Sequence, residues 1–93
     1  KAMNKKNITI LIDAVVQVIN NGRPNEKMVS ISDSTQLLGS ESVLDSLDLF
    51  MFIVELESQL RVAGEDVDVM KIIENAINEN HNITLIDLVT QLQ

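Results

Sequence analysis

The sequence lacks cysteine, tryptophan and tyrosine, and it contains one proline and one histidine among its 93 residues. The absence of cysteine excludes disulfides, thiolate metal sites and a cysteine nucleophile. The single histidine, His81, excludes a histidine-rich metal site, and we predict no metal ligands. The only aromatic residues are Phe50 and Phe52. We therefore predict a core built from Ile, Leu, Val and Met side chains, which repack readily.

Long hydrophobic runs are also absent. The longest run, from Leu49 to Val54, is far shorter than the roughly 20 residues that cross a membrane, and no signal-peptide pattern is visible. These observations predict a cytoplasmic protein without membrane insertion. The length predicts one domain, with a flexible N-terminal segment over residues 1–6 and a folded domain over residues 7–93.

The excess of acidic residues lies in one part of the chain. Residues 41–68 contain eight acids and a single base, Arg61, an excess that equals the formal net charge of −7. The acids are Glu41, Asp45, Asp48, Glu55, Glu57, Glu65, Asp66 and Asp68. One acidic sector disfavours nucleic acid as a partner and favours basic protein surfaces. An acidic face that serves only solubility is an equally good explanation of the charge alone.

The spacing of apolar residues predicts four helices and therefore an all-α protein. The predicted ranges are 8–19, 46–60, 69–77 and 83–92. Asn7 is a suitable N-cap for the first helix, which an Asn-Gly pair and Pro24 then stop. Thr84 and Asp87 have the spacing of a capping box for the last helix, and Asn82 is the alternative cap.

The first predicted helix has one apolar stripe, which we expect to face the core. The stripe consists of Ile8, Ile12, Val15 and Ile19, widened by Leu11, Ala14 and Val18. The connection that follows, residues 22–45, is long for so small a domain, and such loops tend to be functional. We expect four of its apolar residues to anchor it on the core, namely Ile31, Leu37, Leu38 and Val43. Residues 33–35 are expected to cap a short turn over residues 36–38.

The second predicted helix has two apolar stripes. The stripe expected to face the core consists of Leu49, Ile53, Leu56 and Leu60. The second stripe consists of Leu47, Phe50, Met51 and Val54. A surface helix needs only one apolar stripe. The second stripe therefore indicates either deep burial or contact with a partner.

The stretch from Leu38 to Asp48 ends the long connection and opens the second helix. Within it, Asp45-Ser46-Leu47 resembles the Asp-Ser-Leu signature of acyl carrier proteins. The helix order, the long first loop, the acidic second helix and the short third helix are similar to this family over nearly the whole chain. The resemblance implies a four-helix bundle of acyl-carrier type with a long first loop and a short third helix.

The resemblance also implies a covalent cofactor. In acyl carrier proteins a phosphopantetheinyl transferase moves the arm of coenzyme A onto the motif serine, which by position is Ser46. The start of a helix suits a phosphodiester, since it supplies free N–H groups and a partial positive charge. The implied function is a carrier and not an enzyme. It would hold acyl intermediates of a lipid or specialised biosynthetic pathway as thioesters on 4'-phosphopantetheine and present them to partner enzymes.

In this family the second helix and the end of the preceding loop contact the partners. The resemblance assigns this role to Asp45, Leu47, Asp48, Phe50, Val54, Glu55 and Glu57. The implied partners are the transferase and the acyl-loading and acyl-transferring enzymes with basic surfaces, which would meet a monomeric carrier. Met51 is apolar where carriers of primary fatty-acid synthesis usually have an acid. Val43 and Leu44 replace the small residues of those carriers, so the sequence is more similar to stand-alone carriers of specialised pathways.

Other interpretations of the same residues stay open. Ser46 can serve only as a helix cap, and Asp45 can also be a cap, a role compatible with partner contact. The stripe of Leu47, Phe50 and Val54 can be ordinary core. An aminoacyl or peptidyl carrier shares the fold and the arm, although Asp45 before the serine favours an acyl carrier. An unmodified helical adaptor would bind partners through the acidic helix. A Gly-Asp-Ser-Leu hydrolase is disfavoured, because Leu44 replaces the glycine, no strand precedes the motif, and a triad would depend on His81.

Overall fold

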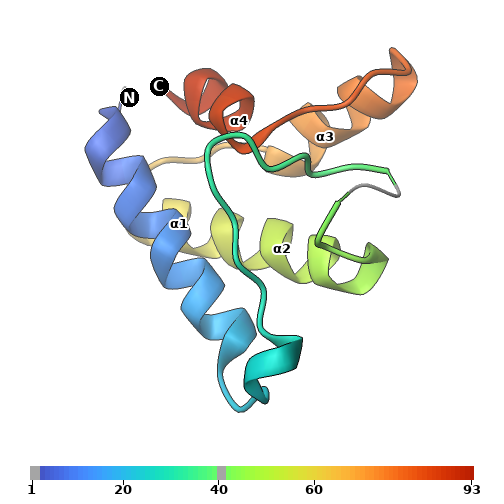
Figure 1. Ribbon diagram of the computed structural model, residues 1–93. Coiled ribbons are helices and arrows are strands. Elements are labelled where there is room, and N and C mark those ends of the chain that lie inside the picture. The colour runs from blue at the N-terminus through green and yellow to red at the C-terminus, as the bar shows by residue number, and fades with distance from the viewer. Residues whose placement is uncertain (1–2, 40–41) are drawn as a thin grey trace.

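The computed structural model describes residues 3–39 and 42–93. These residues form four α-helices and one short 3-10 helix in the connection between the first two (Figure 1). The elements are α1 (Lys5–Asn20), η1 (Asn25–Lys27), α2 (Ser46–Val62), α3 (Val69–Asn78) and α4 (Leu85–Leu92). The predicted all-α class is confirmed over the described residues. No helix among them is long and apolar enough to cross a membrane.

The start of α1 differs from the prediction. The Asn4 side chain caps this helix by accepting a hydrogen bond from the backbone N–H of Asn7 at 2.8 Å. Asn7 is therefore inside the helix, and the prediction that it is the cap is wrong. Within the segment predicted to be flexible (1–6), Lys5 and Lys6 are helical, while residues 1 and 2 lie outside the described residues.

The cap of α4 agrees with one of the two predicted alternatives. Thr84 is the N-cap, and its side chain and that of Asp87 form a reciprocal capping box. Two otherwise unbonded N–H groups are thereby satisfied at the start of the helix. The predicted third helix, α3, has 10 residues, whereas α4 has 8, so the fourth helix is the shorter of the two.

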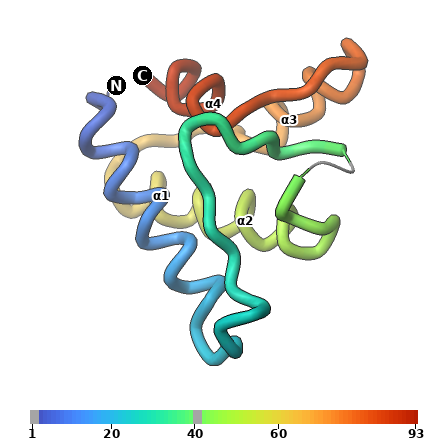
Figure 2. Tube along the Cα trace, viewed as in Figure 1, coloured from blue at the N-terminus to red at the C-terminus, as the bar shows by residue number. Residues whose placement is uncertain are grey.

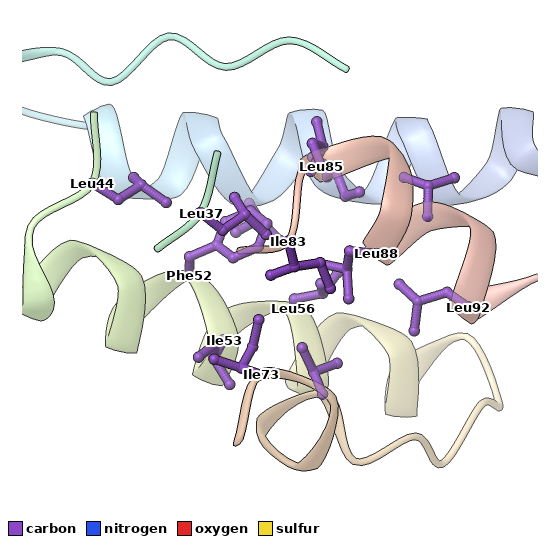
Figure 3. Packing of buried hydrophobic residues seen from close by; sticks show 14 of the residues in the cluster. Leu37, Leu44, Phe52, Ile53, Leu56, Ile73, Ile83, Leu85, Leu88 and Leu92 are labelled. Atoms are coloured by element: carbon purple, nitrogen blue, oxygen red, sulfur yellow. The ribbon is translucent and has the colours of Figure 1, made fainter. Parts of the chain in front are cut away.

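The core is aliphatic around one buried ring. Helix α1 packs on α2 and α4, and α2 also packs on α3. Figure 3 shows Phe52 of α2 among Leu37 of the long connection and Ile83, which precedes α4. The predicted inward stripes of α1 and α2 are confirmed for most members. Leu49 and the two widening residues Leu11 and Ala14 are only half-buried, and Val18 is exposed. The predicted stripes missed Phe52, although it is among the largest fully buried side chains.

The long connection is anchored on the core by residues that only partly match the predicted ones. Leu37 is fully buried, and Ile31 and Leu38 are half-buried. Val43 is 56% exposed, so its assignment as an anchor is wrong. The neighbouring Leu44 takes that place and is buried.

The connection is held by backbone pairing with the segment that joins α3 to α4. Figure 2 shows the two segments side by side. Gln36 forms an isolated antiparallel bridge with Thr84, and the backbone N–H of Leu37 donates to the carbonyl of Ile83 at 2.9 Å. The predicted short turn over residues 36–38 does not form, because Gln36 and Leu37 pair with this segment. A turn lies instead at residues 33–34, where the Thr35 N–H donates to the Ser32 carbonyl at 3.0 Å.

Two asparagine side chains fasten the ends of the connection. The Asn20 amide donates to the carbonyl of Val29 at 2.8 Å and accepts from its N–H at 2.7 Å. The Asn82 amide likewise donates to the carbonyl of Leu38 at 2.8 Å and accepts from its N–H at 3.1 Å. Each side-chain amide thus satisfies the backbone N–H and carbonyl of one connection residue, which a neighbouring strand would otherwise do. The connection is therefore held at Val29 and at Leu38.

Candidate functional site

The start of α2 is organised by Asp45. Asp45 is the N-cap, with its side chain accepting from the backbone N–H of Asp48 at 2.8 Å. Helix α2 begins at the next residue, Ser46. The alternative in which Ser46 is the cap is therefore wrong, and the alternative in which Asp45 is a cap is confirmed.

Ser46 is exposed, and its hydroxyl makes no hydrogen bond to any residue in the described ranges. The backbone N–H groups of Ser46 and Leu47 also lack an acceptor there, as expected for the first turn of a helix. Such N–H groups carry the positive end of the helix dipole and bind phosphate oxygens well. The site therefore combines an accessible hydroxyl with two free donors directly beside it.

A groove of about 520 Å³ opens next to Ser46. Its walls come from the long connection, from the first turn of α2 and from the end of α3. It is lined by Leu37, Leu38, Gly39, Leu44, Asp45, Ser46, Leu49 and Ile77. Five of these residues are aliphatic, so the groove offers an apolar lining to a chain attached at its edge.

Asp48, one of the predicted partner contacts, is turned inward. It is only 8% exposed, and its carboxylate accepts a hydrogen bond from the Arg23 guanidinium at 2.7 Å. This hydrogen bond raises the pKa of Arg23. Arg23 and Lys27 of the connection also line a hollow beside Asp45 and Leu47. The sequence offers no signal for this pairing, because Arg23 and Asp48 are 25 positions apart.

The other two predicted acidic contacts on α2 are half-buried. Glu55 accepts a hydrogen bond from the Gln59 side chain at 3.2 Å. Glu57 accepts one from the backbone N–H of Met70 at 3.0 Å and thereby links α2 to the start of α3. Of the predicted acids on this surface, Asp45 is therefore the most exposed. Glu41, counted in the acidic sector, lies outside the described residues.

The second apolar stripe of α2 is at the surface. Leu47 is 64% exposed, Phe50 55% and Val54 48%, while Met51 is half-buried. The interpretation of Leu47, Phe50 and Val54 as ordinary core is therefore wrong. Ser46, Phe50 and Val54 recur every four residues, so they share one face of the helix, about 6 Å apart along its axis.

His81 is engaged elsewhere. Its Nδ1 lies 2.7 Å from the Asn82 carbonyl and its Nε2 lies 2.9 Å from a Glu79 carboxylate oxygen. The hydrogen bond to the Asn82 carbonyl and that to Glu79 raise the pKa of His81. Within the described ranges no hydrogen bond joins His81 to Ser46. No group of three or more His, Asp or Glu side chains suited to a metal ion occurs among the described residues.

Comparison of the chain with family models, with curated proteins and with solved structures found no match in any of the three. What the site can do chemically therefore follows from its own geometry. An exposed serine that is not needed as a cap, two free N–H donors and an apolar groove meet at the start of α2. This arrangement suits a serine that is covalently modified by a phosphate-linked group.

Proposed function

We propose that this protein is an acyl carrier protein, in which Ser46 accepts a 4'-phosphopantetheine arm from a phosphopantetheinyl transferase. The observation that carries the proposal is the accessible Ser46 hydroxyl at the first position of α2. Asp45 already caps the helix, so esterifying Ser46 removes no hydrogen bond within the described residues. The modification therefore leaves the helix start intact.

The surroundings of Ser46 fit a phosphodiester. The free N–H groups of Ser46 and Leu47 are placed to bind its oxygens. Arg23 neutralises Asp48, which would otherwise add a second negative charge to the first turn of α2. Among the described residues of this turn, the capping Asp45 is the acid that remains without an ion-pair partner. Electrostatics at this turn are therefore compatible with a bound phosphate.

Attachment is a phosphoryl transfer. The Ser46 hydroxyl oxygen attacks the coenzyme A phosphorus that bears the pantetheine chain, and the bond to the second phosphate breaks. Adenosine 3',5'-bisphosphate leaves, and the hydroxyl proton passes to the transferase. When bound, the arm supplies a terminal thiol that holds acyl groups as thioesters, a function this cysteine-free chain cannot supply itself. The groove beside Ser46 gives the chain a place to shelter apolar cargo from water.

The exposed face of α2 supports a carrier that meets several partners. Phe50 and Val54 present apolar side chains in line with Ser46, and Glu55 lies beside them. The exposed Leu47 directly follows Ser46. Apolar residues at the centre of an interface supply affinity, while charges around them choose and steer the partner. Acyl-loading and acyl-transferring enzymes with basic surfaces fit this face. A lipid or specialised biosynthetic pathway is the proposed setting.

Two other functions share part of this support. An aminoacyl or peptidyl carrier would use the same Ser46 and the same arm. An unmodified helical adaptor is favoured by one specific observation, the exposed apolar stripe of α2, which binds a partner whether or not Ser46 is modified. A hydrolase has less support, because His81 is bonded to Asn82 and Glu79 and not to Ser46.

The test is intact-protein mass spectrometry after incubation with coenzyme A and a broad-specificity phosphopantetheinyl transferase. We expect the parent protein to gain one phosphopantetheinyl group and Ser46→Ala to gain none. Ser58→Ala, a half-buried serine on the same helix, is the matched control and should be modified like the parent. Absence of modification with several transferases, or modification of Ser46→Ala, would overturn the proposal. Loading the modified protein with acyl or aminoacyl groups then separates the two carrier classes.

A further inference from the structure

A second groove, of about 190 Å³, lies between α1 and α2 and away from the long connection. It is lined by Val18, Ile19, Phe50, Met51, Val54 and Glu55. Val18 of α1 is 49% exposed, although its place on the first helix predicts a core position. Together with Phe50 and Val54 it forms an apolar surface shared by two helices. Contiguous exposed apolar surface of this kind marks an interaction site.

The position of this groove relates it to Ser46. Phe50 and Val54 follow Ser46 at intervals of four residues on α2, so they continue the same helix face over about 12 Å. Val18 extends that face from α2 onto α1. A protein that brings an active site to Ser46 and lies along α2 can therefore also reach Val18.

The negative charge beside the groove favours a basic occupant. Glu55 is the one charged residue that lines it, and α2 belongs to the sector that contains the whole net charge of −7. A second copy of this chain would bring another Glu55 and another net charge of −7 to the groove, and this like-charge repulsion costs affinity. A basic surface gains from the same charges. The described structure thus favours a cationic protein partner over self-association.

We propose that the groove between α1 and α2 receives an apolar side chain of a basic partner protein, with a lysine or arginine of that partner beside Glu55. Val18 is thereby part of the docking surface, which reaches beyond α2. The proposal rests on the proposed function for the role of that partner, an enzyme acting on the arm at Ser46. The groove itself exists without the arm and can be tested without it.

The experiment is a nuclear magnetic resonance titration of the full ¹⁵N-labelled chain with two synthetic helical peptides. Both peptides carry leucines on one face; lysines flank the leucines in the first and glutamates in the second. We expect saturable shifts at Val18, Phe50 and Val54 with the lysine peptide, and at least about tenfold weaker binding of the glutamate peptide.

Matched variants identify the contact. Val18→Asn should weaken binding of the lysine peptide by about tenfold, as for loss of one central apolar contact. Ile10→Asn, which changes an exposed apolar residue of α1 outside the groove, should stay within about twofold of the parent. Valine, isoleucine and asparagine have similar helix propensities, so both variants keep α1. Glu55→Lys should weaken binding more than Glu74→Lys, an equal change of net charge on α3.

Several results would overturn the proposal. These are shifts that map outside the groove, equal binding of the two peptides, and equal effects of Val18→Asn and Ile10→Asn. Shifts at Val18 that depend on protein concentration without peptide would identify a second copy as the occupant instead. Ser46→Ala should bind the lysine peptide like the parent. Failure of Ser46 to accept the arm and failure of the groove to bind are therefore separate outcomes.

Discussion

The anchoring of the long connection can be tested by comparing Leu37→Ala with Val43→Ala. Both residues are aliphatic and both lie in the connection, but Leu37 is fully buried and Val43 is 56% exposed. Shortening Leu37 to alanine removes three carbons, worth about 0.8 kcal/mol each in transfer free energy. The cavity left behind raises the loss of unfolding free energy to about 3 kcal/mol. Val43→Ala removes only surface carbons and should stay within about 0.5 kcal/mol of the parent.

The assay is urea unfolding followed by far-ultraviolet circular dichroism, because the chain has no tryptophan or tyrosine for fluorescence. With a denaturant slope of about 1 kcal/mol per molar urea, Leu37→Ala should lower the midpoint by about 3 M. That loss is a large part of the roughly 5–14 kcal/mol expected for a chain of this size. Equal midpoints for the two variants, or a Leu37→Ala shift below about 1 M, would refute the proposed anchoring of the connection.

Two further predictions concern the helix cap and the histidine. Asp45→Ala should lower the free energy of unfolding by about 1 kcal/mol through loss of the cap, whereas Asp45→Asn keeps a good cap and should change it little. Urea midpoints measure both changes. Equal losses for the two variants would contradict the capping role. The pKa of His81, followed by its ring resonances during a pH titration, should lie above the ordinary value and fall in Glu79→Gln. Because the pKa of His81 is raised in the folded state, protonation of His81 stabilises the fold. This stabilisation is fully present below the ordinary pKa and disappears as the pH rises through the folded-state pKa. A folded-state pKa at or below the ordinary value would contradict this prediction.

Local signals were enough to predict most of the helical framework. Apolar periodicity and caps depend on residues within one or two turns of each other, and they located α2, α3 and α4 within two residues at each boundary. The capping box of Thr84 and Asp87 is such a local signal. The error at α1 has a local cause too, since Asn4 and Asn7 are both acceptable caps and the sequence does not distinguish them.

The candidate site was only partly predictable. The position of Ser46 at the start of an acidic helix followed from the motif and the apolar pattern. The inward turn of Asp48 did not, because it depends on Arg23, which the fold brings within 2.7 Å from 25 positions away. The lining of the groove was equally unpredictable, since Ile77 and Ser46 line one groove only because α3 packs on α2.

By itself, the sequence determined the all-helical class, the order of the helices and the placement of Ser46 at a helix start, because each depends on contacts between near neighbours along the chain. The tertiary structure decided which apolar residues are buried. Val18 and Val43 carry the same side chain as buried valines, yet both are exposed. Their exposure depends on how the elements pack on one another, as at the groove between α1 and α2 that Val18 lines. Such long-range packing leaves no periodic signal in the sequence.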